Sequence, residues 1–164
     1  MRMIFVARPI TTDTDKGRKR ILRQMAKVKG SHVSIGLHED EQPYGDGTRV
    51  QDVGYWHEFG VGQAERSWLR STFDENRRKW RRRTKVLLAS VILGRTTVER
   101  SLRQLGFEMK NEVQNKIETM RTPGNAPSTI AQKPTIGDNP LINTRKLKRS
   151  VKSKVHLKTL LGFK

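Results

Sequence analysis

The chain has 164 residues and a mass of 18.9 kDa, which is the usual size of one domain. Its 34 Lys and Arg residues outnumber its 16 Asp and Glu residues, giving a formal net charge of +18. The absence of cysteine excludes disulfides, thiolate metal sites and cysteine nucleophiles. We expect a single domain over residues 1–164, with a positive surface that meets an acidic partner or is partly buried in an assembly.

The apolar segments are too short to cross a membrane. The longest run, 86–93, has eight residues, whereas a bilayer-spanning helix needs about 20. The segment 3–7 is too short for the hydrophobic region of a signal peptide, and we expect it to form a strand that ends at Pro9. These features predict a soluble protein, made in a cytoplasm, with no membrane partner.

The next segments predict a helix, a strand and a second helix. Thr14 or Asp15 can cap a helix that runs to about Lys29, where Gly30 follows. Alternating apolar residues then predict a half-buried strand over 31–37. A short helix is expected over 48–59.

Two long helices are expected in the middle of the chain. Residues 72–75 have the spacing of a capping box at the start of a helix over 71–93, and residues 96–99 repeat that spacing before the second helix. The second helix carries a continuous apolar stripe: Val98, Leu102, Leu105, Met109, Val113, Ile117 and Met120. Gly106 is a mild defect in this helix, because glycine has a low helix propensity.

The C-terminal part predicts a long loop, a short helix and a last strand. Residues 121–140 contain four prolines and two glycines, and a loop of this length is a linker, a disordered segment or an arm that orders on a partner. A turn-helix is expected over 141–149 and a strand over 151–157. The predicted fold is α+β, with a small mixed or antiparallel sheet packed against three to four helices.

The sequence lacks the residue patterns of enzymes and metal sites. His57 and Glu58 are not followed by the second histidine of a zinc-protease helix, and there is no Gly-x-Ser-x-Gly motif. The acidic run 39–41 could bind a divalent ion but is more typical of a solvated strand end. We expect no catalytic residue, no metal and no cofactor.

The positive charge is concentrated in two regions. Residues 61–100 hold 11 basic and 4 acidic residues, and residues 121–164 hold 10 and 1. These regions are interpreted either as solvated faces or as contacts to DNA or an acidic partner. The candidate contact residues are Arg77, Arg78, Lys79, Arg81, Arg82, Arg83, Lys85, Lys148, Arg149, Lys152 and Lys154. Only Trp80 interrupts the densest run, so contact with DNA would be electrostatic and indifferent to sequence.

Three segments resemble one known family. Residues 53–60 end in His-Glu-Phe-Gly, and residues 65–70 read Glu-Arg-Ser-Trp-Leu-Arg. This pair is similar to the helix end and the aromatic-Leu-Arg loop of the head–tail joining or tail-completion proteins of tailed bacteriophages. The strand over 33–37 matches the family's first strand, and residues 139–151 resemble its Pro-Leu-Ile-Asp-Thr-Gly-x-Leu-x-x-Ser-Ile segment.

The chain departs from the family pattern in two places. The prolines of the family's loop are replaced here by Ala64, Ser67 and Ser71, and the glycine after Thr144 is replaced by Arg145. The turn after Thr144 therefore cannot use glycine's freedom at positive φ.

The resemblance implies a structural protein of the virion neck or tail, assembled in the host cytoplasm and without catalytic activity. It implies a ring, with six copies as the natural number. The other partners would be neck and tail proteins such as the tail terminator, the head-completion or connector protein, and the tail tube. The expected subunit or partner interface contains Glu58, Phe59, Gly60, Arg66, Trp68, Leu69, Arg70, Leu141, Thr144 and Leu147.

Two other interpretations stay open. Trp68, flanked by arginines, has the composition of an interface anchor, but a core position explains it almost as well. The net charge of +18 also fits a free, sequence-nonspecific nucleic-acid-binding protein, or less well a ribosomal type of RNA binder. The long apolar stripe and the cluster of aromatic residues favour a packed domain over the latter.

Overall fold

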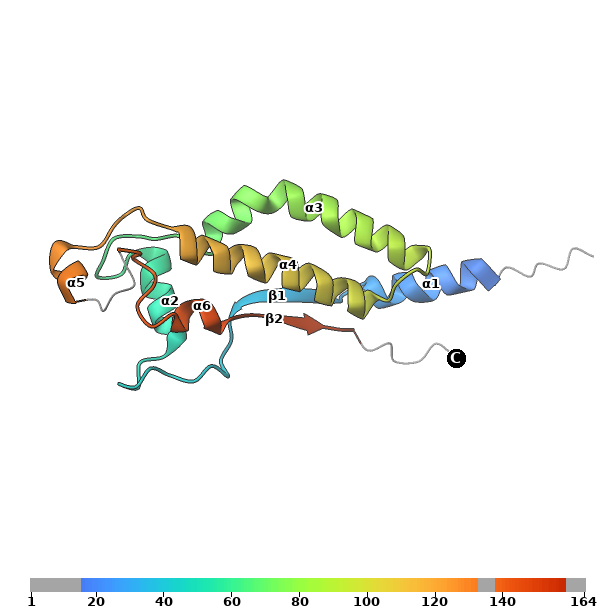
Figure 1. Ribbon diagram of the computed structural model, residues 1–164. Coiled ribbons are helices and arrows are strands. Elements are labelled where there is room, and N and C mark those ends of the chain that lie inside the picture. Colours follow the sequence, from blue (N-terminus) through green and yellow to red (C-terminus); the bar gives the residue numbers. More distant parts are fainter. Residues whose placement is uncertain (1–15, 133–137, 159–164) are drawn as a thin grey trace, which may run out of the picture.

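The computed structural model describes residues 16–132 and 138–158. Strands β1 (His32–Leu37) and β2 (Val151–His156) pair antiparallel and form a two-stranded sheet (Figure 1). Both strands and the α+β class were predicted from the sequence, and both predictions are confirmed. The strand expected over 3–7 lies outside the described residues.

Helices make up most of the described chain. They are α1 (Lys16–Val28), α2 (Val50–Phe59), α3 (Arg70–Ile92), α4 (Val98–Thr119), α5 (Pro127–Gln132) and α6 (Lys146–Ser150). The first four and α6 confirm the predicted helices with small differences at their ends. The long loop expected over 121–140 is corrected in part, because it contains the short helix α5. None of the described helices is long and apolar enough to span a membrane.

Helix α4 is the central element of the molecule. It packs against both strands on one side and against α3 on the other, so that it lies between α3 and the sheet (Figure 1). Five of the seven residues of its predicted apolar stripe are buried, Val113 and Ile117 completely, and Leu102 and Met120 are partly buried. The expected core face of this helix is therefore confirmed.

Gly106 lies where the sheet comes closest to α4. A Cβ atom at this position would lie 2.7 Å from Cγ2 of Val33 on β1 and 3.0 Å from Cβ of Ser153 on β2. Contacts this short do not occur between packed carbon atoms, which prefer about 3.5–4.0 Å. Gly106, which has a low helix propensity, is therefore the position at which the absence of a side chain allows the sheet to pack closely against α4.

The core consists of two apolar clusters. One gathers around α2, α6 and the C-terminal half of α4, and its buried members are Val50, Trp68, Val113, Ile117, Leu141, Ile142, Leu147 and Val151. The other joins α3 to α4 through Trp80, Leu87, Leu105 and Met109. Trp80 was the residue of the basic run expected to point inward, and its burial confirms this.

The starts of the two long helices differ from the predicted capping boxes. Helix α3 begins at Arg70, and Thr72 lies inside it, where its hydroxyl donates a hydrogen bond to the carbonyl of Trp68. Helix α4 is capped by Thr97, whose Oγ1 accepts a hydrogen bond from the Arg100 N–H at 3.2 Å. The first box is therefore wrong. At the second, the cap is Thr97 instead of Thr96, and the residue three positions later is Arg100, so the threonine cap is present without the acidic partner of a capping box.

Candidate interaction surfaces

The segment that resembles phage neck proteins forms a tight corner between α2 and α3. Helix α2 ends at Gly60, which has the left-handed conformation (φ 70°) and whose N–H bonds back to the carbonyl of Trp56. A side chain at Gly60 would lie 2.9 Å from the backbone nitrogen of Glu65. Glycine is needed here both for the positive φ and for the close return of the chain.

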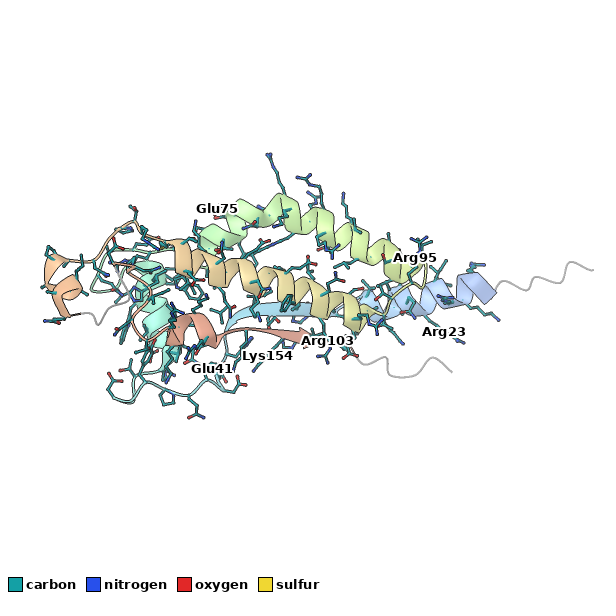
Figure 2. All side chains as sticks on the ribbon, viewed as in Figure 1. Arg23, Glu41, Glu75, Arg95, Arg103 and Lys154 are labelled. Carbon is teal, nitrogen blue, oxygen red and sulfur yellow. The ribbon has the colours of Figure 1, made fainter. Side chains whose placement is uncertain are left out.

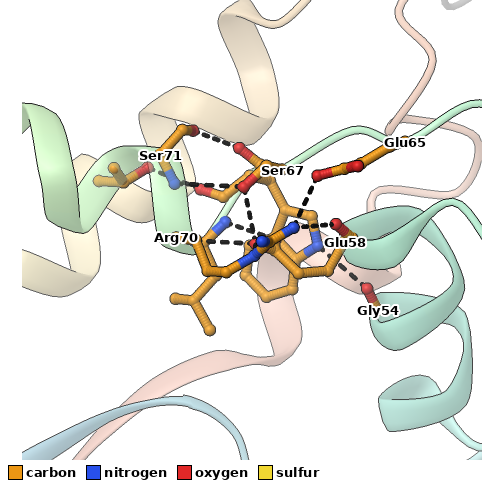
Figure 3. Close-up of polar contacts among 9 residues, drawn as sticks. Gly54, Glu58, Glu65, Ser67, Arg70 and Ser71 are labelled. Atoms are coloured by element: carbon orange, nitrogen blue, oxygen red, sulfur yellow. Dashed lines mark hydrogen bonds and ion pairs between the residues drawn. The ribbon is translucent and has the colours of Figure 1, made fainter.

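The carboxylate of Glu58 holds this corner together (Figure 3). Glu58 is 5% exposed, and it accepts hydrogen bonds from the hydroxyl of Ser67 at 2.8 Å and from the N–H groups of Leu69 and Arg70 at 2.8 and 2.9 Å. The last two groups are the free donors at the N-terminus of α3. A residue from α2 thus accepts hydrogen bonds from two of the free N–H groups of α3, while the local hydroxyl of Ser67 accepts one from the N–H of Ser71 at 3.3 Å. The negative charge of Glu58 also suits the positive end of the helix dipole.

Arg70 covers the outside of the same carboxylate. Its guanidinium donates to Glu58 at 3.0 Å and to Glu65 at 2.7 Å, and it lies 4.7 Å from the centre of the Phe59 ring. The hydrogen bond to Glu58 is the main cause that raises the pKa of Arg70 above its ordinary value. The side chain is half exposed, so it both closes the corner and forms part of the surface.

Arg66 joins the corner to the loop after α4. It is 5% exposed, and it donates to the carbonyls of Pro123 at 2.9 Å and Gly124 at 2.8 Å and to the side chain of Gln63 at 3.2 Å. Burial lowers the pKa of Arg66 from its ordinary value. Its guanidinium is therefore a fixed internal connector between two loops and is not offered to a partner.

Trp68 is a core residue in this structure, which corrects its interpretation as an exposed anchor. Its side chain is 2% exposed, and its ring N–H donates to the carbonyl of Gly54 at 3.2 Å. A Cβ atom at Gly54 would lie 2.3 Å from Leu37 and 3.3 Å from the Trp68 ring. Glycine on α2 therefore creates the space into which β1 and Trp68 both pack.

The predicted interface residues in the segment 139–151 also include both buried and exposed side chains. Leu141 and Leu147 are buried in the core cluster, whereas Thr144 is exposed. Asn139, which sequence reasoning missed, is buried and donates to the last carbonyls of α4, while its side-chain oxygen accepts from the N–H of Leu141 at 2.8 Å. Arg145 has φ 60°, so the turn uses the left-handed region without the glycine that the family places there.

The exposed part of the predicted interface is aromatic. Phe59 is 49% exposed and lies 4.8 Å from the ring of Tyr55, which is 55% exposed one turn earlier on α2. Trp56 and Val61, their neighbours in the sequence, are 41% and 48% exposed. We name Tyr55, Trp56, Phe59 and Val61 the α2 patch. Leu69 is partly buried and packs against the core, so Phe59 and Arg70 carry the surface of this segment.

A second apolar surface lies on α1, at the opposite end of the molecule from α2 (Figure 1). The helix has an apolar face on which Ile21, Leu22 and Met25 are 39%, 57% and 41% exposed. It packs mainly against α3 and α4, and the guanidinium of Arg20 donates a hydrogen bond to the carbonyl of Gly94, between these two helices, at 2.9 Å. We name these three residues the α1 patch. The structure thus presents apolar side chains at both ends.

The basic residues between 77 and 85 on α3 fall into two groups, those that form ion pairs with α4 and those that do not. Lys79 pairs with Glu112, and Arg83 pairs with Glu108 at 2.6 Å, so both side chains connect α3 to α4. The hydrogen bond to Glu108 raises the pKa of Arg83. The other five cations of the run are exposed, and within the described residues none of them pairs with a carboxylate: Arg77, Arg78, Arg81, Arg82 and Lys85.

The basic residues near β2 are largely neutralised by the protein itself. Lys148 pairs with Glu118, Lys152 with Glu41 at 2.5 Å and Lys154 with Asp40 at 2.7 Å. These pairs join α6 to α4, and β2 to the loop after β1. The pKa of Glu118 is lowered by Lys148, and that of Asp40 is lowered by Lys154.

The remaining cation of this group, Arg149, is exposed on α6. The acidic run 39–41 is largely committed to ion pairs with β2, as the pairs of Asp40 and Glu41 demonstrate. Across residues 16–132 and 138–158, no group of three or more histidine or acidic side chains is arranged to hold a metal ion.

Comparison with known proteins adds no relative. No protein-family model, no curated protein and no solved structure matches the chain. The resemblance to phage neck proteins therefore depends on the residues of the α2–α3 corner and of the segment 139–151, and the function inferred from it is a proposal.

Proposed function

We propose that this protein is a structural subunit of the neck or tail-completion region of a tailed phage, where copies of it form a ring that joins head to tail. Six copies are the proposed number, and the ring would contact other neck and tail proteins. The observation that carries the proposal is the α2–α3 corner. Residues 53–60 and 65–70, the pair of segments in which the resemblance begins, build this corner.

The geometry of the corner supports the proposal because some residues of the motif hold the backbone in place and others face the solvent. Glu58, Gly60 and Arg66 fix the backbone, while Phe59 and Arg70 face outward. A rigid corner that presents an aromatic ring beside a guanidinium has the composition of a protein–protein hot spot. The buried members of the motif would thus act through the shape that they give to the α2 patch.

The two apolar patches support self-assembly. A soluble monomer rarely keeps contiguous apolar surface exposed at two separate sites. The α1 and α2 patches differ from each other and lie at opposite ends of the molecule (Figure 1). Contacts between unlike surfaces of identical subunits generate closed rings when the rotation closes.

The test is assembly of the full chain with purified phage tails and heads, with and without substitutions in the α2 patch. The variant Tyr55→Gln/Phe59→Gln removes two of the three exposed rings of the α2 patch and keeps residues of good helix propensity. Phe107→Gln on α4 is the matched control, because Phe107 is 59% exposed and lies outside the predicted interface. We expect the double variant to fold, as followed by circular dichroism, but to fail in ring formation and in head–tail joining, and the control to retain both.

The proposal is wrong if the wild-type chain stays monomeric in the presence of tail components and if particles that lack it still join heads to tails. Salt-sensitive binding of the monomer to DNA, without assembly, would instead favour the free nucleic-acid-binding protein.

A further inference from the structure

The exposed face of α3 carries a concentration of positive charge that the rest of the protein does not use. Eight of the basic residues of the chain lie on this helix, and three of them, Arg70, Lys79 and Arg83, are bound to carboxylates of the protein. The five that remain are Arg77, Arg78, Arg81, Arg82 and Lys85, which we name the α3 ridge. Figure 2 shows long side chains that project from the outer side of α3, away from α4.

The five cations share one face of the helix. At 100° per residue they fall within an arc of roughly 140°, opposite the side on which Trp80 and Leu87 enter the core. At a rise of 1.5 Å per residue, the ridge is about 12 Å long. Asp74 lies on the same arc at its N-terminal end, and the neighbouring Glu75 is bound to Lys116. The ridge is therefore a continuous cationic strip on an ordered support.

The composition of the strip favours a phosphate backbone over an acidic protein. Protein interfaces have apolar or aromatic residues at their centre and few charges there. Within the arc of the ridge, between residues 77 and 85, the exposed side chains are only Arg and Lys. Four of the five are arginines, whose planar guanidinium binds phosphate oxygens through two hydrogen bonds at once. A duplex is favoured over a single strand, because the aromatic ring next to the ridge on α3, Phe73, is 38% exposed and packs edge-on against Trp80, so it offers at most one stacking position for a series of bases.

We propose that the α3 ridge binds the phosphate backbone of duplex DNA without sequence preference. A DNA duplex presents one negative charge per about 1.7 Å of its axis, so a 12 Å strip can meet several phosphates at once. This binding does not depend on the ring or on the proposed phage function. Lys79, Arg83, Lys148, Lys152 and Lys154, which belong to the initial set of DNA candidates, are excluded from the ridge by their ion pairs.

The number of phosphates sets the expected salt dependence. The logarithm of the binding constant falls with the logarithm of salt concentration with a slope of about −0.9 per phosphate contacted. Five contacts give a slope of about −4.5, which corresponds to a loss of affinity of about 500-fold between 50 and 200 mM salt. Fewer contacts would give a proportionately smaller slope.

The experiment measures binding of the full chain to a fluorescent 30-base-pair duplex at several salt concentrations. The ridge variant replaces its five cations: R77Q, R78Q, R81Q, R82Q and K85Q. The matched control removes the same charge from other exposed positions: K19Q, R23Q, K29Q, R95Q and R149Q. Circular dichroism and thermal unfolding establish that both variants fold, as expected for exposed residues replaced by a good helix former.

We expect the ridge variant to bind at least about 100-fold more weakly at 50 mM salt with a slope near zero, and the control to lose less than about tenfold. An equal loss in both variants would overturn the proposal, since binding would then follow net charge. Absence of binding by the wild-type chain at 50 mM salt would also overturn it. So would a ridge variant that retains DNA binding but no longer binds a tail or head protein, because the ridge would then face an acidic protein.

Discussion

Replacing Gly106 by alanine separates the effect of helix propensity from that of packing. Glycine in a helix interior is about 1 kcal/mol less favourable than alanine, so the sequence alone predicts that Gly106→Ala stabilises the protein. The structure predicts the opposite, because the new methyl group would lie 2.7 Å from Val33 and 3.0 Å from Ser153. These two contacts come from different strands of the sheet, and neither atom is the end of a flexible side chain.

The change in the free energy of unfolding is the difference between the cost of the close contacts and the gain in helix propensity. Forcing a methyl group into a closely packed site costs about 1–3 kcal/mol, and here the contacts are nearly 1 Å shorter than the preferred carbon separation. Because the contacts are so short, the upper part of that range, about 2–3 kcal/mol, applies. After subtraction of the propensity gain of about 1 kcal/mol, we expect the free energy of unfolding to fall by about 1–2 kcal/mol. For a chain of this size that corresponds to a melting temperature lower by about 2–8 °C.

The assay is thermal and urea unfolding of Gly106→Ala beside Asn111→Ala. Asn111 is exposed on the same helix, so its replacement should give the propensity gain alone and raise the melting temperature slightly. Adding Val33→Ala to Gly106→Ala should recover part of the loss as a favourable coupling between the two sites. If Gly106→Ala raises the melting temperature as Asn111→Ala does, the close approach of the sheet to α4 is refuted.

Three further predictions concern other parts of the fold. Trp68→Ala should lower the free energy of unfolding by about 3–5 kcal/mol in urea titrations, and a stable variant that merely fails to assemble would restore the anchor interpretation. Arg145→Gly should raise it by about 1 kcal/mol, because a residue other than glycine is strained at φ 60°; no change in calorimetry would contradict this. The pKa of Glu118 is lowered by Lys148, so their interaction should stabilise the protein fully above the ordinary pKa of glutamate and be lost as pH falls through the lowered folded-state pKa. The difference in stability between wild type and Lys148→Gln should then shrink in acid, and a difference that grows in acid would contradict the pair.

The elements of the fold were predictable because local patterns determine them. The spacing of the apolar stripe on α4 and the alternation in β1 report directly which side faces the core. The inward position of Trp80 follows from the same periodicity.

The α2–α3 corner was less predictable because it depends on contacts between distant residues. The N–H groups at the start of α3 bond to Glu58, which belongs to another helix. The local sequence pattern therefore predicted the start of this helix wrongly, with Thr72 as its cap. The burial of Trp68 depends on the space left by Gly54, which no periodic pattern reveals. The motif that resembles phage proteins was recognisable, but which of its residues face outward was not.

The sequence also could not predict which basic residues of α3 form ion pairs and which stay exposed without one. Lys79 and Arg83 differ from their neighbours only because α4 places Glu112 and Glu108 opposite them. That pairing depends on the relative position of two packed helices, which periodicity within one helix does not determine. Helix α5 is a similar case, because its segment is rich in proline and glycine and gave only the signal of a loop.

The most direct measurement of the central proposal is the absolute mass of the purified protein by light scattering, alone and after incubation with purified phage tails. We predict a discrete closed species close to six times the 18.9 kDa chain mass, which persists at high salt because apolar patches hold it together. A species of one chain mass under all these conditions, with no chain bound to the tails, would contradict the ring.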